Sequence, residues 1–208
     1  GSYGRRRKTG IFPARAAGRT DYRDGRRRLN SVRIIGGSYR RRVLRFPDSE
    51  GLRPTPDRVR ETLFNWLGQE LDGRHCLDLF AGSGALGFEA ASRGAARVVM
   101  IEQAPKVLAA LHENAQMLQN LPEVEIMRRD ALQYLASAKS KFDLIFLDPP
   151  FNQGWIPRLA PLLAGVANED AAIYVEAEEQ IEALGDWRAV RHGKAGEVHF
   201  HLMRREAV

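Results

Sequence analysis

Hydrophobic and polar residues alternate with two different periods along the chain, and the change of period outlines its elements. After Gly73, short apolar runs alternate with longer stretches in which apolar residues recur every three or four positions. This alternation is typical of a parallel sheet with helices on both faces. The apolar runs predict strands at 75–80, 97–101, 124–128, 142–147 and 171–176, and the stretches between them predict helices at about 84–93, 105–119, 131–138 and 156–165.

The last part of the chain has an antiparallel signature. The segments 187–191 and 198–203 flank Gly193-Lys194-Ala195-Gly196, which predicts a hairpin that closes one edge of the sheet. We therefore expect an α/β fold with a seven-stranded, mostly parallel sheet and an antiparallel terminal hairpin.

The segment before Gly73 predicts a small β-hairpin followed by a helix. The apolar segments 32–35 and 42–46 are separated by Gly36-Gly37-Ser38 and carry basic residues on one face, so we interpret them as paired strands. Asp57 is expected to cap a helix from 58 to about 67, because the apolar residues of that segment have the spacing of a buried helical stripe.

The first residues have a different composition. Residues 1–28 are rich in arginine and glycine with almost no apolar periodicity, so we expect them to lack a fixed fold until an anionic partner binds. The chain then divides into a basic arm (1–28), an extension with the hairpin and helix (29–72) and a larger α/β domain (73–208). A length of 208 residues, 44% of them hydrophobic, suits one well-filled core with a small appendage.

Positive charge is concentrated at the start of the chain. Residues 1–45 contain fifteen Lys or Arg and two acids, a balance of +13 that leaves −7 for the rest of a chain whose net charge is +6. A basic segment joined to a mildly acidic domain indicates a polyanionic partner that the basic segment contacts. A solvated tail explains residues 1–28 equally well.

Other features exclude several classes of protein. There is no run of about eighteen apolar residues and no apolar signal core after the first arginines, so we expect neither a membrane span nor a secretory signal, and a cytoplasmic location. The single cysteine, Cys76, lies in an apolar stretch and is interpreted as a buried residue rather than a nucleophile. The five histidines are scattered, which indicates no metal site, and we interpret them as surface or RNA-facing residues.

Three glycines mark the junction between the first strand and the first helix of the larger domain. The spacing Gly82-x-Gly84-x-x-Gly87 permits a tight turn and lets a ligand lie against bare backbone N–H groups. Glu102, about twenty residues further on at the end of the second strand, is placed to accept hydrogen bonds from ribose hydroxyls. These residues predict a nucleoside-bearing cofactor, and the glycine spacing alone fits both NAD and an adenosyl compound.

Two further acids favour S-adenosylmethionine. Asp78 precedes the glycines, where a carboxylate suits the ammonium of a methionine group and repels a pyrophosphate. Asp130 follows the third strand, where it can accept from an adenine amino group, cap the helix 131–138, or do both. The expected cofactor-binding residues are Asp78, Phe80, Ala81, Gly82, Ser83, Gly84, Glu102, Asp130 and Ala131.

The candidate catalytic residues form the tetrapeptide Asp148-Pro149-Pro150-Phe151 at the end of the fourth strand. An aromatic amino group is a poor nucleophile, because its lone pair is delocalised into the ring. The Asp148 carboxylate and the Pro149 carbonyl can each accept one of its N–H groups and aim the lone pair at a methyl donor. Pro150 stiffens the loop, and Phe151 offers a face on which an extruded base stacks. Taken alone, the tetrapeptide also fits a simple turn that ends a strand.

From about residue 32 to 203, the chain resembles the RsmD family of bacterial guanine-N2 methyltransferases. The resemblance is carried by residues 53–67 (RPTPDRVRETLFNWL), 78–87 (DLFAGSGALG) and 148–151 (DPPF). It implies a Rossmann-like class I methyltransferase that modifies the N2 amine of one guanine in small-subunit (16S) ribosomal RNA, in the assembled or assembling 30S particle. Residues 1–28 are not part of the family pattern.

We assign RNA contact to the basic hairpin and the segment after it, because the larger domain is net negative. The expected RNA-binding residues are Arg33, Arg40, Arg41, Arg42, Arg45, Arg53, Arg58 and Arg60. The expected partners are ribosomal RNA and the 30S subunit, without a membrane or a metal, for a protein that acts as a monomer. Two alternatives remain open: an adenine-N6 methyltransferase on RNA or DNA, since the Asp-Pro-Pro-aromatic motif also occurs in such enzymes, and a non-catalytic RNA-binding assembly factor.

Overall fold

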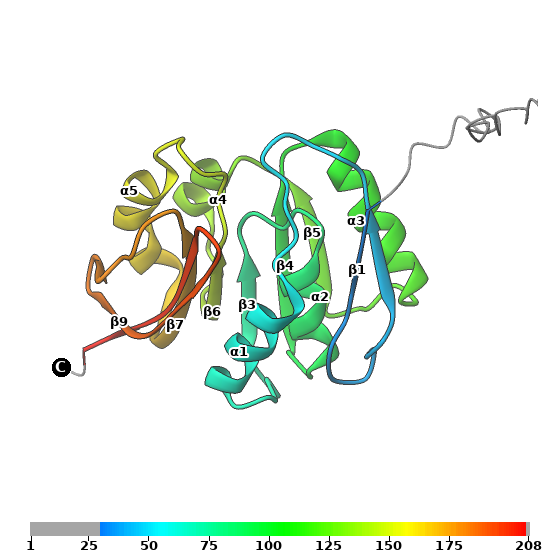
Figure 1. Ribbon diagram of the computed structural model, residues 1–208, viewed down its shortest axis with the longest axis horizontal. Helices are drawn as coiled ribbons and strands as arrows, with labels where there is room; N and C mark the ends of the chain where they lie inside the picture. The colour runs from blue at the N-terminus through cyan, green and yellow to red at the C-terminus, as the bar shows by residue number, and fades with distance from the viewer. Residues whose placement is uncertain (1–29, 207–208) are drawn as a thin grey trace, which may run out of the picture.

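One mixed β-sheet organises the residues that the structure describes, 30–206 of the computed structural model (Figure 1). Its strands are β3 (His75–Asp78), β4 (Arg97–Glu102), β5 (Val124–Arg128), β6 (Phe142–Leu147), β7 (Ala167–Ala177), β8 (Ala183–Leu184), β9 (Trp187–Ala195) and β10 (Val198–Arg205). The order across the sheet is β5-β4-β3-β6-β7-β10-β9-β8. Strands β3 to β7 are parallel, and β8 to β10 add an antiparallel edge. The predicted arm, 1–28, lies outside the described residues.

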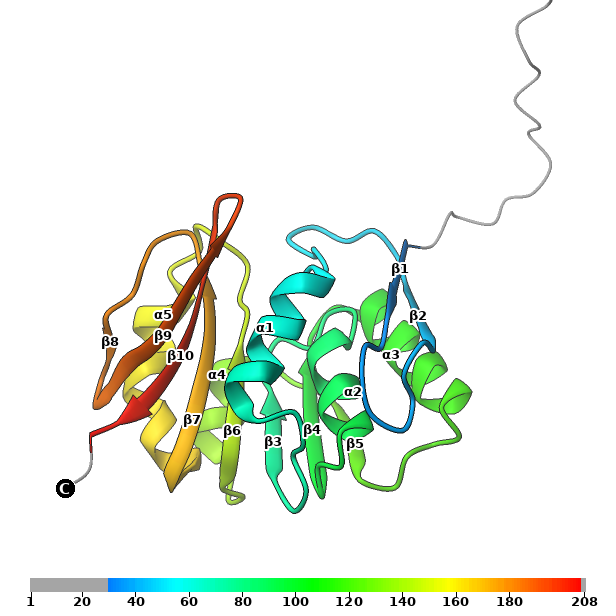
Figure 2. The same cartoon turned by 60° about the horizontal axis from the view of Figure 1, so that its bottom comes forward.

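Helices cover both faces of this sheet. On one face lie α1 (Asp57–Leu67), α2 (Ala85–Ser92) and α3 (Pro105–Met117), together with a hairpin of β1 (Asn30–Arg33) and β2 (Val43–Phe46). Figure 2 shows α1 and α2 in front of the sheet. The other face is covered by α4 (Ala131–Ser137), α5 (Trp155–Leu159) and the 3-10 helix η1 (Ala160–Val166).

Alternate residues of the central strands enter two separate hydrophobic cores. In β3, Cys76 belongs to the core beneath α1 and α2, and the next residue, Leu77, belongs to the core on the opposite face, because successive side chains of a strand point to opposite sides. Burial raises the pKa of the Cys76 thiol to about 12. The interpretation of Cys76 as a buried residue is therefore confirmed.

The strand order reverses beside β3, and this reversal positions the site. Strands β4 and β5 extend the sheet on one side of β3, and the chain then crosses back to add β6 and β7 on the other side. At such a switch point the loops diverge and leave a crevice at the carboxyl ends of the strands, where ligands bind in open α/β sheets. The loops after β3 and β6 therefore meet at one edge.

Most of the predicted elements are confirmed, with differences in the number of strands and in the helix that follows β6. The sheet has eight strands rather than seven, because the two-residue β8 pairs with β9. The predicted helix 156–165 is divided, since α5 ends at Leu159 and the chain continues as η1. Pro161 lies in the first turn of η1 and cannot donate the backbone hydrogen bond of a continuing α-helix.

The predicted cap of the first helix is wrong. The residue before α1 is Pro56, and no side chain caps the helix. Asp57 lies inside the first turn instead, where its carboxylate accepts hydrogen bonds from Arg33 and Arg60.

The N-terminal hairpin docks its turn on the C-terminal end of α2. The first strand lies two residues earlier than the predicted 32–35, and the second begins one residue later than the predicted 42–46. The first strand ends at Arg33, and the backbone N–H groups of Ile35 and Gly36 donate to Glu89 of α2. The Ser38 N–H donates to the carbonyl of Ser92 at 2.8 Å. Gly37 has a φ of +78°, and a Cβ there would overlap that carbonyl, so this close contact requires glycine.

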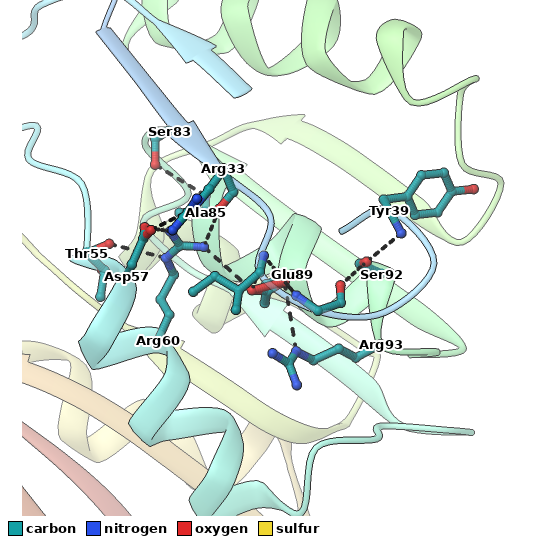
Figure 3. A network of polar contacts seen from close by, with 12 residues as sticks. Arg33, Tyr39, Thr55, Asp57, Arg60, Ser83, Ala85, Glu89, Ser92 and Arg93 are labelled. Atoms are coloured by element: carbon teal, nitrogen blue, oxygen red, sulfur yellow. Dashed lines mark hydrogen bonds and ion pairs between the residues drawn. The ribbon is translucent and has the colours of Figure 1, made fainter. Parts of the chain in front are cut away.

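Glu89 is the centre of a buried polar network that joins the hairpin, α1 and α2 (Figure 3). Its carboxylate lies 2.9 Å from the Ile35 nitrogen and 3.6 Å from the Arg60 guanidinium. Both charged side chains are fully buried. Burial raises the pKa of Glu89, while the backbone donors and two arginines oppose the shift.

Arg60 is the main hydrogen-bond donor on the α1 side of this network. Its guanidinium donates to the carbonyls of Thr55 and Arg33, at 3.2 and 2.8 Å, and to the Asp57 carboxylate at 2.6 Å. The segment before α1 and the hairpin are thereby joined through Arg60. The expectation that Arg60 faces RNA is wrong for this structure, because a fully buried guanidinium has no access to a phosphate.

Replacing Glu89 should destabilise the whole described fold. We expect Glu89→Ala to lower the free energy of unfolding by about 3–5 kcal/mol, because it removes one of the two carboxylates that pair with the buried Arg60 and leaves the Ile35 and Gly36 N–H groups without their acceptor. Glu89→Gln should cost less, since its amide oxygen can still accept from Ile35. Urea unfolding followed by circular dichroism measures both. The matched control is Glu113→Ala on the exposed face of α3, expected to change stability by less than about 0.5 kcal/mol; equal effects of Glu89→Ala and Glu113→Ala would contradict this role.

Candidate active site

Two adjoining cavities open at the carboxyl edge of the sheet. The larger, of about 380 Å³, is lined by residues that include Glu102 and Trp155. The smaller, of about 40 Å³, is lined by residues that include Asp78 and Asp148. Phe80 lines both cavities, and its ring meets that of Trp155 edge-on at 5.2 Å between centroids. An extended ligand can therefore occupy both cavities by passing over Phe80.

The structure brings most of the predicted cofactor residues to these cavities. Phe80, Ala81, Gly82 and Ser83 line the smaller one together with Asp78, and Ala131 lines the larger one with Glu102. The two remaining residues begin helices: Gly84 precedes α2, and Asp130 precedes α4.

The glycine loop, residues 82–87, has the geometry that its sequence predicts. Gly84 has a φ of +83°, and a Cβ there would overlap the ring of Phe88. The Gly87 N–H donates to the Asp78 carboxylate at 3.0 Å, an approach that a side chain at Gly87 would crowd. The first turn of α2 therefore lies against a buried acid.

Asp78 is a carboxyl group that lacks a cationic partner among the described residues. It is 1% exposed. Burial raises its pKa to about 7, with further contributions from the charges of Glu102 and Glu176, while the Gly87 N–H opposes the shift. A positively charged ligand group beside it would restore the anionic form, so the site is suited to a cation.

Glu102 is held at the rim of the larger cavity by three backbone donors. One carboxylate oxygen accepts from the Gly82 N–H at 2.9 Å, and the other accepts from the N–H groups of Gln103 and Ala104 at 3.1 Å each. The side chain thus bridges the glycine loop to the end of β4. This arrangement orients the carboxylate before any ligand arrives.

Asp130 caps α4, since its carboxylate accepts from the Gln133 N–H at 3.1 Å. Its neighbours Arg129 and Ala131 line the larger cavity. The capping role is confirmed, and contact with an adenine amino group stays a prediction.

The tetrapeptide 148–151 follows β6 directly and lies beside the glycine loop. The Asp148 side chain is 16% exposed and lines the smaller cavity with Asp78 and Ser83. Pro149 is buried, and Phe151 is partly exposed. The acid of the tetrapeptide and the acid before the glycine loop therefore face one cavity.

Glu176 is a buried acid next to this site that the sequence analysis missed. Its Oε1 atom accepts from the Tyr174 hydroxyl at 2.7 Å and from the Thr55 hydroxyl at 3.0 Å. Burial raises the pKa of Asp148, and the Glu176 carboxyl group beside it raises the pKa further, while Arg53 lowers it. The available signal was a single glutamate inside the apolar run 171–177.

Arg53 reaches the tetrapeptide from the loop before α1. Its Cζ atom lies 3.4 Å from the centroid of the Phe151 ring, and its Nη2 atom lies 3.8 Å from the Asp148 carboxylate. The other predicted RNA contacts lie elsewhere. Exposed side chains on the hairpin and α1 are those of Arg33, Arg40, Arg41, Arg42, Arg45 and Arg58.

Two of these exposed arginines already have partners in the protein. Arg33 forms an ion pair with Asp57 at 2.9 Å, and Arg42 donates to the carbonyl of Met117 at the end of α3. The hairpin is thus anchored to α1 and α3 at its edges, while the side chains of Arg40 and Arg41 near its turn are exposed.

The expectation that all five histidines lie on the surface is wrong for His201. This residue is fully buried, accepts from the Ile181 N–H, contacts the Val175 carbonyl and stacks with His192. Burial lowers its pKa. Within residues 30–206, no group of three or more His, Cys, Asp or Glu side chains is arranged to hold a metal ion, and no helix has the length and apolar character needed to cross a bilayer.

Comparisons with known proteins identify relatives of this chain in sequence and in fold. The family model described as "Conserved hypothetical protein 95" matches residues 32–204. The Escherichia coli (strain K12) protein named ribosomal RNA small subunit methyltransferase D is 42% identical over 181 residues, which cover 85% of this chain and 91% of the relative. The solved structure of yhhF from Escherichia coli superposes with a TM-score of 0.76 at 40% identity and covers 86% of this chain and 100% of that one. A structure of an RNA methyltransferase from Salinibacter ruber in complex with S-adenosyl-L-homocysteine covers 75% of this chain and 96% of that chain, with a TM-score of 0.60 at 19% identity, a likeness of fold.

Proposed function

The chain belongs to the RsmD family, and from that premise we propose that it transfers a methyl group from S-adenosylmethionine to the exocyclic N2 amine of a guanine in small-subunit ribosomal RNA. Family membership supports S-adenosylmethionine as the cofactor and small-subunit ribosomal RNA as the substrate. Guanine N2 as the target atom and the 30S particle as the form of the substrate are our proposals. The observation that best supports this reaction is that Asp78 and Asp148 line the same cavity.

The cavities fit the cofactor by charge and by shape. The buried Asp78 carboxyl group suits the ammonium of the methionine moiety, because a cation stabilises its anionic form. Glu102, oriented by three backbone N–H groups, would hold the ribose hydroxyls. The adenine would lie in the larger cavity between Phe80 and Ala131, with Asp130 near its amino group.

The residues after β6 would activate the amine. When bound, the cofactor supplies an electrophilic methyl group on a sulfonium, whose sulfur leaves as a neutral thioether. Asp148 accepts one N–H of the target amine and the Pro149 carbonyl accepts the other, so the nitrogen lone pair points at the methyl carbon. As the N–C bond forms, the surplus proton of the nitrogen passes to the Asp148 carboxylate, whose raised pKa suits it to hold that proton.

A methyl-transfer assay tests the proposed function directly. Small ribosomal subunits, naked small-subunit RNA and duplex DNA are incubated with protein and labelled S-adenosylmethionine, and the modified nucleosides are identified. We expect N2-methylguanosine from the ribosomal substrates. N6-methyladenosine as the product would replace the guanine proposal by the adenine alternative, and an absence of transfer to all three substrates would favour a non-catalytic assembly factor.

Removing the proposed ribose acceptor should weaken cofactor binding. Glu102→Ala should raise the Kd of S-adenosylmethionine by the equivalent of about 1–3 kcal/mol, because a charge-assisted acceptor is lost. Calorimetric titration measures the Kd. Glu179→Ala, an exposed acid outside both cavities, is the matched control; an unchanged Kd for Glu102→Ala would remove Glu102 from this role.

At acidic pH, the dependence of the methylation rate on pH (its acid limb) should follow the ionisation of Asp148. Since Asp148 must be ionised to accept the amine N–H and since its pKa is raised, the single-turnover rate should increase with pH through that raised pKa. Glu176→Gln removes the neighbouring charge, so it should lower the pKa of Asp148 and move the acid limb to lower pH. Asp148→Ala should lower the rate at least about a hundredfold at every pH while cofactor binding persists. Identical acid limbs for the wild type and Glu176→Gln would contradict the coupling of the two carboxyl groups.

The exposed hairpin arginines should dominate the salt dependence of RNA binding. Each phosphate contact contributes roughly 0.7–0.9 to the logarithmic slope of affinity against salt, so changing Arg40, Arg41 and Arg42 together to alanine should flatten the slope. Cofactor affinity should not change. The control removes the same charge from β9, at the exposed Arg188, Arg191 and Lys194. Wild-type affinity and slope in the Arg40–Arg42 variant would exclude the hairpin as the main RNA contact.

A further inference from the structure

The loop between β2 and α1 lies directly over the proposed reaction site. Gly51, Leu52 and Arg53 line the smaller cavity. A Cβ at Gly51 would lie 3.2 Å from the Pro150 side chain, and one at Gly82 would lie 2.7 Å from the Leu52 side chain. The loop thus contacts the glycine loop and the tetrapeptide at once, and Arg53 extends from it over Phe151.

The position of Arg53 is set by stacking more than by an ion pair. Its Cζ atom lies over the Phe151 ring, 3.4 Å from the ring centroid. The separation of 3.8 Å from Asp148 is long for a charged hydrogen bond, and 38% of the Arg53 side chain is exposed. Such exposed cation–π contacts are weak compared with the stacking of a nucleobase on an aromatic ring. A base that enters the site can therefore displace Arg53.

The guanidinium presents the same planar arrangement of N–H donors as one edge of guanine, with a positive charge in addition. In guanine, the atoms N1, C2, N2 and N3 form a guanidine, and its N1–H and N2–H groups point in one direction as hydrogen-bond donors. Adenine presents a single amino donor beside the N1 lone pair, which a carboxylate repels. A subsite with a flat aromatic face and a carboxylate at its edge suits a planar group that carries N–H donors on the side of the carboxylate, as both an arginine and guanine do.

We propose that Arg53 is a placeholder for the target base: its guanidinium stacks on Phe151 and faces Asp148 where the guanidine portion of guanine lies in the RNA complex, and it leaves when RNA binds. The identity of the base rests on the proposed function. Two physical consequences follow. The subsite selects guanine over adenine by the number of donors it can accept, and the displaced Arg53, on a loop at the mouth of the site, becomes available to a phosphate.

Nuclear magnetic resonance of the full chain, labelled at its arginines and saturated with S-adenosylhomocysteine, tests the placeholder without any need for activity. The Nε–Hε resonance of Arg53, assigned by its loss in Arg53→Lys, should carry a ring-current shift that Phe151→Leu removes. Guanosine 5′-monophosphate should remove the same shift, and adenosine 5′-monophosphate at equal concentration should not. An unchanged resonance in Phe151→Leu, no response to the guanosine nucleotide, or equal responses to both nucleotides would overturn the proposal.

A competition experiment adds a matched pair of variants. Arg53→Ala opens the subsite, so ethylguanidinium should inhibit its methylation of small subunits competitively with RNA, with an inhibition constant at least fivefold below that of the wild type. Arg58→Ala removes the same charge from an exposed position of α1 and should retain the wild-type inhibition constant. Arg53→Lys keeps the charge without the planar group and should behave as Arg53→Ala. Equal inhibition constants for the variants at positions 53 and 58 would overturn the proposal.

Failure of this inference and failure of the proposed function give different results. If the methylated product is N2-methylguanosine while Arg53 stays on Phe151 with the guanosine nucleotide bound, the placeholder is wrong and the function stands. If the product is N6-methyladenosine while only the guanosine nucleotide displaces Arg53, the proposed reaction is wrong, and the subsite still binds a guanidine-like edge.

Discussion

The buried ion pair of Glu89 and Arg60 is the interaction on which the arrangement of the N-terminal segment depends. Both side chains are fully buried, and each is satisfied by groups from other elements: Glu89 by the backbone of the hairpin turn, and Arg60 by the carbonyls of Arg33 and Thr55. A buried charge without partners is costly, so the hairpin, α1 and α2 are stable only when they come together.

This network continues to the reaction site through one residue. The Thr55 carbonyl accepts from Arg60, while the Thr55 hydroxyl donates to Glu176, the acid beside Asp148. Arg53, two positions earlier, lies over Phe151. The loop that carries both residues is thus held at its end by buried hydrogen bonds and is partly exposed at Arg53. A proposed RNA surface and a proposed catalytic acid are therefore connected by a short, physically continuous set of contacts.

The acidic site and the basic hairpin carry opposite charges and are suited to different ligands. The carboxyl groups of Asp78, Asp148 and Glu176 lie close together in a mostly buried region. Glu176 raises the pKa values of both Asp78 and Asp148, and Asp78 raises that of Asp148 further. Such a site is suited to bind a cationic cofactor and to accept N–H groups, but it repels RNA phosphates. The exposed arginines of the hairpin supply the attraction that our proposal requires.

The sequence by itself determined the α/β pattern, the glycine loop and the acids after the strands, because hydrophobic periodicity and the residues at strand ends are local properties of the chain. The strand order then brings these residues to one edge of the sheet. The tertiary packing decided which polar residues are buried and which residues distant in sequence meet at the site. In sequence, Arg60 is indistinguishable from its exposed neighbours. It is buried in the fold, where it pairs with the buried carboxylate of Glu89, 29 positions away. His201 is buried because β10 lies inside the sheet between β7 and β9. Glu176 reaches Asp148 only because β6 and β7 are adjacent, and Arg53 covers Phe151 only because the loop before α1 crosses the carboxyl edge.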